Sequence, residues 1–449
     1  MSRPHQTAAA MLLGTLAVAS LGACASAPRP VIVAADGQGK VVPVDSLTTS
    51  WVSGGVRVIL RPAPSNDVVA ANLYLLGGSR QLTARTAGIE YLLLTASEFG
   101  TRRYPGDEAR RALARTGAEI VVDPGPDWTV VGLRALAADI DSAWAVFADR
   151  VAAPELDSTA VELARGRLLA RARRVRESPD LLVGFLADSA AFAGHPYGIP
   201  AAGTERSLAA LQGDDLRRYL REQMVTSRML LVVVGNVTRH ELDSLVSATL
   251  GRLPAGDYRW TMPPAPPRLD TTHPVIVERH SPTNYVYAQF PGPPATSEDY
   301  AAFEVAVALL GSKLHHSIRE ERSLSYAAMA PFDDRAIAVG GAYASTARPA
   351  EVVPLMRRAL GEMQSERFDD VGIHGYVRHF ITDYYLANET NAAQAEAIAR
   401  ATLFGGDPRA TTRERAAIEH VSAGDVYRVA RTYMRNVQFV FVGDTGTAR

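Results

Sequence analysis

Histidine pairs are the first candidates for chemistry in this sequence. Two histidines on one face of a helix can hold a zinc ion while a neighbouring glutamate polarises the attacking water. The chain has ten histidines, but neither His-x-x-Glu-His nor His-Glu-x-x-His occurs in it. The pair His315 and His316 and the pair His374 and His379 have spacings that do not bring two imidazoles onto one helical face. We therefore expect these histidines to lie in loops or at the surface and to form no zinc site.

Arginines are concentrated in one stretch of predicted helix. The members of this stretch are Arg165, Arg167, Arg171, Arg173, Arg174 and Arg176. The favoured interpretation is a solvated helix face whose charge is balanced by neighbouring acidic residues. The alternative is a cleft lining that attracts acidic segments of a peptide. Reversing the charge at Arg171 would distinguish the two.

Cys24 is the only cysteine, so the chain has no internal disulfide. It is preceded by Arg3, by an apolar run over residues 8–21 that is too short for a permanent span, and by Leu21-Gly22-Ala23. This ending resembles the bacterial lipobox. The resemblance implies cleavage before Cys24 and acylation of its thiol and new amino terminus. An ordinary signal peptide, cut near an Ala-x-Ala sequence, is the alternative.

The residues after Cys24 favour a tethered envelope protein. Residues 24–50 are rich in Ala, Pro, Gly and Val without helical periodicity, which is typical of a tether. Ala25 stands where an aspartate would be associated with retention in the inner membrane. We therefore expect a lipid-anchored protein on the periplasmic face of the bacterial cell envelope, located at the outer membrane.

Composition bounds the fold and the partners. A chain of 449 residues with 47% hydrophobic and 21% charged residues is too long for one ordinary core and too apolar for disorder. Its 47 Lys and Arg residues against 48 Asp and Glu residues give a net charge of -1. Since binding to DNA or RNA requires a basic surface, we expect no nucleic-acid partner.

The order of predicted elements occurs twice. Each half begins with two strands and ends with an apolar strand before Gly-Asn or Gly-Asp, at Gly235-Asn236 and Gly443-Asp444. A proline-rich linker separates the halves. The predicted divisions are 1–23 (signal peptide), 24–50 (tether), 51–251 (first domain), 252–273 (linker) and 274–449 (second domain). The predicted strands are 56–60, 68–76, 118–122, 128–136, 229–234, 275–278, 285–290, 326–329, 336–344 and 439–442. The predicted helices are 87–99, 106–115, a helical region from 138 through 193, 214–223, 239–250, 298–310, 350–366, 370–387, 392–404 and 422–434.

Several strings in a fixed order resemble the pitrilysin/insulinase (M16) peptidase family over residues 51–443. The resemblance implies an α+β fold of two homologous halves, each a mixed β-sheet flanked by helices, joined as a clam-shell. The strings are Gly77-Gly78-Ser79-Arg80, residues 88–95, Gly100-Thr101 with Tyr104-Pro105, His195-Pro196-Tyr197-Gly198 with Gly203-Thr204-Glu205, Leu309-Leu310-Gly311 and residues 318–326.

The family's zinc site is replaced in this sequence. The family carries His-x-x-Glu-His, and the matching positions are Tyr91, Leu94 and Thr95. The third ligand, a glutamate, aligns with Ala164, and a supporting glutamate aligns with Arg171 on the same helix face. The resemblance therefore implies that this chain binds no zinc.

Arg319 and Tyr326 match a pair that binds substrate in two-subunit members of this family. There the guanidinium and the phenol reach the zinc site of the opposing half and contact the substrate backbone and the developing oxyanion. The alternative is an arginine in an ion pair at a helix end and a core tyrosine. Ser323 replaces the family's glycine, so a left-handed turn there would be less comfortable.

The resemblance implies a non-catalytic subunit. Its partner would be a zinc-bearing peptidase of the same family, forming a heterodimer that binds peptide substrates, with zinc only in the partner. The second hypothesis is an envelope shell that binds peptides or has a structural role without proteolysis. A self-sufficient zinc peptidase with a relocated site is the third and least favoured.

Overall fold

The computed structural model describes residues 33–35, 41–43, 47–266, 272–366 and 368–448. Cys24 and the predicted signal peptide lie outside these residues. Strands β1 (Val33–Ala35) and β2 (Val41–Pro43) pair antiparallel inside the predicted tether and belong to a unit of their own, Met1–Val44. In the described residues, no helix combines the length and the apolar content that a membrane span needs.

The first half is built on a six-stranded mixed sheet in the order β3-β4-β8-β5-β7-β6. Strands β4 and β8 run parallel, whereas the other neighbours run antiparallel. The strands are β3 (Thr49–Ser53), β4 (Val56–Pro62), β5 (Val68–Leu76), β6 (Glu119–Pro124), β7 (Trp128–Leu136) and β8 (Met229–Gly235). Thr49 and Ser50, the first two residues of β3, fall within the predicted tether, so the folded sheet begins two residues earlier than the sequence predicts.

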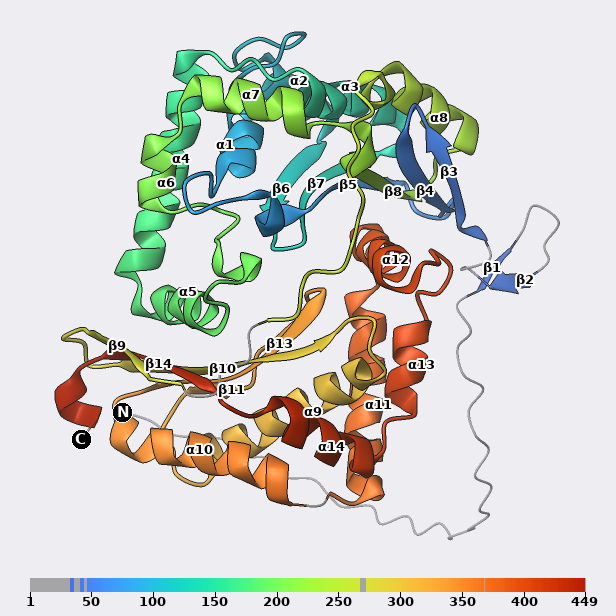
Figure 1. The fold of residues 1–449 in the computed structure, drawn as a ribbon. Coiled ribbons are helices and arrows are strands. Elements are labelled where there is room, and N and C mark those ends of the chain that lie inside the picture. Colours follow the sequence, from blue (N-terminus) through green and yellow to red (C-terminus); the bar gives the residue numbers. More distant parts are fainter. Residues whose placement is uncertain (1–32, 36–40, 44–46, 267–271, 367, 449) are drawn as a thin grey trace, which may run out of the picture. The chain divides into compact units, whose positions relative to one another are not determined.

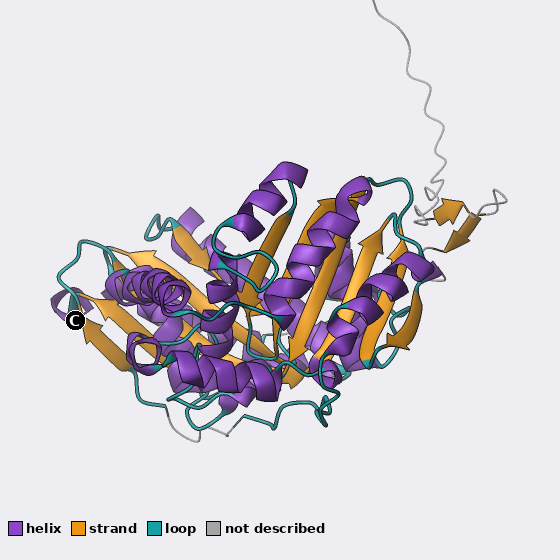
Figure 2. Cartoon of the chain, turned by 90° about the horizontal axis from the view of Figure 1, so that it is seen from above, coloured by secondary structure: helices purple, strands orange, loops and turns teal. Residues whose placement is uncertain are grey.

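The second half repeats this pairing. Its sheet has the order β11-β13-β10-β14-β9, with β12 on β13. Strand β9 runs parallel to the last strand, β14, as β4 does to β8, and β14 pairs antiparallel with β10, as β8 does with β5. The strands are β9 (Val275–Glu278), β10 (Asn284–Pro294), β11 (Ala327–Met329), β12 (Phe332–Asp333), β13 (Ile337–Thr346) and β14 (Gln438–Gly443). Two mixed sheets flanked by helices confirm the predicted α+β fold (Figure 2).

Helices cover both sheets (Figure 1). The first half has α1 (Ile89–Ala96), α2 (Glu108–Thr116), α3 (Ile140–Ala152), α4 (Ser158–Glu177), α5 (Pro179–Ala191), α6 (Glu205–Ala210), α7 (Gly213–Gln223) and α8 (Arg239–Ala248). The second has α9 (Asp299–Leu314), α10 (Pro349–Ser365), α11 (Asp370–Ala387), α12 (Asn391–Gly405), α13 (Arg413–Glu419) and α14 (Ala423–Tyr433).

The helical region predicted over 138–193 contains three separate helices. Pro154 follows the end of α3, and the Asp157 side chain then caps α4 by accepting from the Ala160 amide. Pro179 begins α5, where its missing N–H costs nothing. Turn residues therefore set the boundaries of the helices predicted from 138 through 193.

The two halves exchange one helix each. Helix α5 of the first half packs its Leu182, Val183 and Ala187 against Val440 and Val442 of β14. In return, α12 of the second half lies against β5 and β8 of the first sheet (Figure 1). Its buried contact residues are Ala395, Ile398, Ala399 and Leu403. Each sheet is thus covered on one face by its own helices and on the other by a helix from the opposite half.

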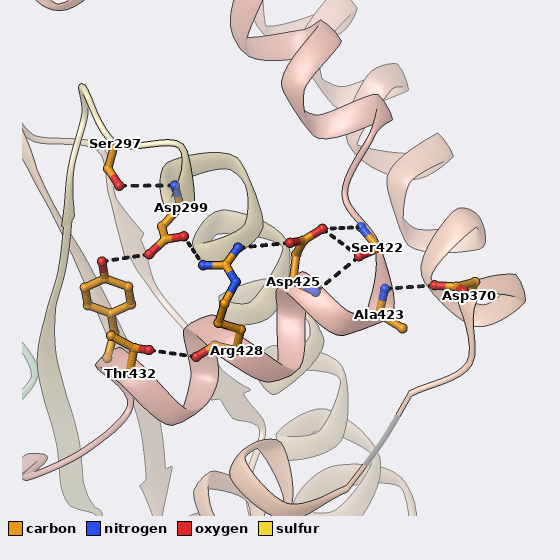
Figure 3. Close-up of polar contacts among 9 residues, drawn as sticks. Ser297, Asp299, Asp370, Ser422, Ala423, Asp425, Arg428 and Thr432 are labelled. Carbon is orange, nitrogen blue, oxygen red and sulfur yellow. Dashed lines mark hydrogen bonds and ion pairs between the residues drawn. The ribbon is translucent and has the colours of Figure 1, made fainter.

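Polar contacts fix the start of α9 against α14 (Figure 3). Arg428 of α14 forms ion pairs with Asp299, in the first turn of α9, and with Asp425. The Tyr433 hydroxyl donates to Asp299 Oδ2 at 3.0 Å. Ser422 caps α14 in a capping box with Asp425. These contacts hold the two helices at one corner of the second half.

Candidate functional site

Tyr91 and Arg171 meet between α1 and α4, where the resemblance placed a zinc site. Arg171 Nη1 donates to the Tyr91 hydroxyl at 3.3 Å. The guanidinium carbon also lies 5.6 Å from the centroid of the Tyr91 ring. The two helices pack together along this stretch. A phenol and a guanidinium in mutual contact occupy this cleft.

The other positions of the degenerate site are buried among apolar groups. Leu94 is 1% exposed and Ala164 is 0% exposed, and neither side chain has a metal-ligand atom. The Thr95 side chain offers only a buried hydroxyl. With a permanent cation at Arg171, this set of groups does not fit a divalent ion. No step of zinc chemistry can therefore be assigned to this cleft.

A buried charge cluster that the sequence did not single out anchors α1. Glu90 Oε2 lies 3.0 Å from Arg228 Nη2 and accepts from the Tyr219 hydroxyl at 3.0 Å. Both charged side chains are at most 5% exposed. The ion pair raises the pKa of Arg228 against its desolvation by burial, and burial with the nearby Glu90 charge raises the pKa of Tyr219. The available signal was a glutamate inside the apolar pattern of residues 89–94.

The arginine stretch on α4 is largely a balanced, solvated face. Arg167 pairs with Glu98, and Arg173 and Arg176 both pair with Glu205. Arg165 is the buried exception, and its Nε lies 3.1 Å from Glu162 Oε1. The favoured interpretation is confirmed for the paired members. Arg171 differs because its contact is the ring and hydroxyl of Tyr91.

Arg319 and Tyr326 lie together on an exposed surface. Arg319 is in a π-helical segment, His315–Glu320, that follows α9. Its guanidinium carbon is 4.9 Å from the centroid of the Tyr326 ring. Tyr326 is 87% exposed, which excludes the alternative of a core tyrosine. Both polar heads face solvent with the arginine stacked on the ring.

The turn between Arg319 and Tyr326 has the left-handed backbone that the replaced glycine would favour. Ser323 has φ 51° and is one of two non-glycine residues with positive φ among the described residues. The Ser323 amide donates to the Arg319 carbonyl at 3.0 Å. Within the part of the chain that the structure describes, no hydrogen bond, ion pair or ring contact joins this segment to the Tyr91–Arg171 pair.

The His195-Pro196-Tyr197-Gly198 string has a structural role. His195 Nε2 lies 2.8 Å from the Pro264 carbonyl of the linker. The Tyr197 hydroxyl donates to Asp127 at 2.7 Å, and Asp127 in turn accepts from the Ala336 amide of the second half at 2.8 Å. Burial raises the pKa of Asp127 and of Tyr197. These buried contacts connect the first half to the linker and to the second sheet.

One other group of potential metal ligands lies at the ends of β9 and β14. Glu278, His280 and Asp444 place ligand atoms within 4.8 Å of one another, but the first two residues are exposed. Acidic clusters of this kind are common at protein surfaces without a metal. No metal site follows from it.

Comparisons with known proteins agree with this architecture. The model of "Insulinase (Peptidase family M16)" matches residues 57–205, and that of "Peptidase M16 inactive domain" matches residues 210–378. The uncharacterized zinc protease YmxG of Bacillus subtilis is 26% identical over 184 residues, which are 41% of this chain and 45% of that protein. The mitochondrial-processing peptidase subunit beta of Lentinula edodes is 24% identical over 418 residues, covering 87% and 88% of the two chains.

A solved structure shows the same fold. The crystal structure of a peptidase M16 inactive domain from Pseudomonas fluorescens superposes with a TM-score of 0.78 at 16% identity, covering 88% of this chain and 98% of that one. The two family models match in the order of the two halves. The chain therefore belongs to the insulinase (M16) peptidase family.

Proposed function

We propose that this chain is a non-catalytic subunit that pairs with a zinc-bearing M16 peptidase and helps bind its peptide substrate. The Tyr91–Arg171 contact carries the proposal, because it places a permanent cation beside a neutral phenol where the family's zinc site would lie. The relative from Lentinula edodes is itself named as the beta subunit of a processing peptidase. In the proposed assembly, zinc belongs to the partner alone.

Arg319 and Tyr326 are the groups that this chain would contribute to the shared site. A guanidinium and a phenol are donors that suit peptide carbonyls and a developing oxyanion. Stacking limits the freedom of the long arginine side chain, which lowers the entropy lost when it binds. The 87% exposure of Tyr326 leaves the pair accessible to an opposing subunit.

The proposed location is the periplasmic face of the outer membrane, with Cys24 as the lipid-anchored residue. The support is the lipobox-like ending at Leu21-Gly22-Ala23-Cys24. Radiolabelled palmitate tests this part. Labelling of the chain that disappears in Cys24→Ala supports the anchor, whereas equal labelling of both contradicts it.

The test of the subunit role begins with the purified chain. We expect less than stoichiometric zinc and no cleavage of unstructured peptides. A zinc-bearing M16 peptidase from the same organism should then form a complex with it and gain turnover. Stoichiometric zinc with chelator-sensitive cleavage by the chain alone would overturn the proposal, and absence of any complex would favour a binding shell without proteolysis.

Substitutions in the second half test the shared site. In the assembled pair, Arg319→Ala and Tyr326→Phe should each lower kcat at least about tenfold while the complex stays intact, since each removes one oriented donor. Arg322→Ala is the matched control, because Arg322 is a nearby exposed arginine paired with Glu321. Unchanged turnover in both test variants would remove the proposed role of these residues.

A further inference from the structure

A cavity of about 800 Å³ lies in the second half among α9, α11, α12 and α13. In Figure 1, α11 and α13 lie side by side at the right of the second half, with α12 above them and α9 next to α11. The volume falls within the range of sites that enclose small organic ligands, roughly 300–1,000 Å³. The cavity is separate from the Tyr91–Arg171 pair and from Arg319 and Tyr326, none of which lines it.

Carboxylates outnumber cations in the lining of this cavity. The lining carboxylates are Glu298, Glu304, Asp334, Asp383, Glu396 and Glu414, and the lining cations are Arg400 and Arg413. The lining therefore has six carboxyl groups against two guanidinium groups. Such an excess favours a positively charged occupant.

Two of the carboxylates are already satisfied by the protein. Arg400 forms an ion pair with Asp334 and donates to the Tyr300 hydroxyl at 3.3 Å. Glu396 accepts a hydrogen bond of 2.7 Å from the Tyr74 hydroxyl of the first sheet. Arg400 therefore pairs with Asp334, and its charge also partly offsets the effect of burial on the pKa values of Glu304 and Glu414.

Glu304 of α9 has a carboxylate oxygen that no other group of the described residues binds. Its Oε2 atom is buried and has no hydrogen-bond partner among the described residues. A buried carboxylate oxygen without a partner is costly, so proteins rarely retain one unless something else binds it. Burial, together with the nearby charges of Glu414 and Asp334, raises the pKa of Glu304 to about 8. Burial likewise raises the pKa of Glu414, on the facing α13.

The remaining wall is apolar. Phe380 and Tyr384 of α11, Phe404 of α12 and Ile418 of α13 line the cavity together with several alanines. Aromatic and aliphatic walls with a few convergent polar groups are typical of sites that bind small organic molecules. The lining therefore offers an apolar surface for a ligand's stem and carboxylates for its charged end.

We propose that this cavity binds an organic cation, an ammonium or guanidinium group on an apolar stem, with Glu304 and Glu414 as counter-ions. The charged end would donate a hydrogen bond to Glu304 Oε2, which has no partner among the described residues, and the stem would lie against the aromatic wall. A basic side chain of a peptide and a free alkylamine share this chemistry. The inference does not depend on the proposed subunit role.

Calorimetric titration of the full chain at pH 8 tests the site with n-hexylamine as the probe. We expect one binding site, with n-hexanol at least about tenfold weaker because it lacks the charge. Glu304→Gln and Glu414→Gln should each weaken hexylamine at least about tenfold. Glu351→Gln, at an exposed position of α10 outside the cavity, is the matched control and should leave binding unchanged.

Proton release gives a second measurement. A bound cation favours the ionised form of Glu304, which faces Glu414 of α13, Asp334 of the β12–β13 connection and Arg400 of α12. At pH 7, hexylamine binding should therefore release a proton, measured by titration in buffers of different ionisation enthalpy. This release should disappear in Glu304→Gln.

The source of the cation is tested in the same titration. A short lysine-containing peptide and its acetyl-lysine counterpart, both with blocked amino termini, show whether a peptide side chain reaches the cavity. Selective binding of the lysine form supports a peptide occupant, and hexylamine binding alone supports a free amine. Equal binding of hexanol and hexylamine, undiminished binding by Glu304→Gln, or no binding of either probe at millimolar concentration would overturn the proposal.

Discussion

Helices α1 and α9 occupy equivalent places in the two halves. Helix α1 follows β5, which pairs with β8, and α9 follows β10, which pairs with β14; β8 and β14 are the last strands of their sheets. Each carries a buried glutamate oxygen. Glu90 on α1 is neutralised by Arg228 and bound by Tyr219. Glu304 on α9 faces a cavity and has an oxygen without a partner among the described residues. The contrast teaches that the first half neutralises its buried glutamate with an ion pair, whereas the second half holds a carboxyl group whose pKa burial raises and whose Oε2 atom has no partner among the described residues.

The largest expected effect is the loss of stability when the Glu90–Arg228 ion pair is broken. Arg228→Met should lower the free energy of unfolding by about 3–5 kcal/mol, because Glu90 stays buried without its counter-ion. The Leu76 and Gln223 carbonyls also lose the donors that Arg228 supplies at 2.8 and 3.0 Å. Urea denaturation followed by circular dichroism measures the loss.

The double variant Glu90→Gln/Arg228→Met is the control. Because it removes both charges, it should be more stable than Arg228→Met alone. A double variant as unstable as the sum of the two single losses would show that the side chains act independently, and the contrast between α1 and α9 would fail.

The second prediction concerns Glu304 and the pH dependence of stability that it causes. The folded-state pKa of Glu304, about 8, lies above the ordinary glutamate value of 4.5. The folded chain therefore holds a proton that the unfolded chain loses, so the contribution of Glu304 to stability falls as the pH rises from about 4.5 to about 8. Glu304→Gln should leave stability nearly unchanged at pH 5 and raise it by about 2–5 kcal/mol at pH 8.

Denaturation curves at several pH values test this prediction. The variant and the unsubstituted chain should diverge only above pH 5, with Glu351→Gln as the control that follows the unsubstituted chain. A constant difference between Glu304→Gln and the unsubstituted chain at every pH would show that Glu304 does not titrate in this range.

The smallest effect concerns the corner that holds α9. Asp299→Asn should cost about 0.5–1 kcal/mol, because the ion pair with Arg428 is half exposed while the Tyr433 hydrogen bond can persist. The loss should shrink in 1 M NaCl, since salt screens exposed pairs. A loss that is the same at both salt concentrations would assign the contribution to packing instead of charge.

Local patterns predicted much of the fold. The strands over 128–136 and 275–278 and the helix over 370–387 have the predicted bounds. Helix spacing also placed Arg171 on the face that meets Tyr91. Periodicity and turn residues are properties of neighbouring residues, so a sequence displays them directly.

Long-range contacts account for what the sequence did not predict. α13 has seven residues, too few for a clear period. The role of Glu90 depends on Tyr219 and Arg228, and that of Glu304 on Glu414, partners that only the tertiary fold brings near. No local pattern distinguishes a paired buried glutamate from an unpaired one, because the difference lies entirely in distant partners.

The exchange of α5 and α12 means that neither half is a complete folding unit. A half made alone would expose the apolar face that the other half's helix covers, so the two should unfold in one cooperative transition. A protease cut within residues 253–266, a stretch without helix or strand, would leave the fragments associated.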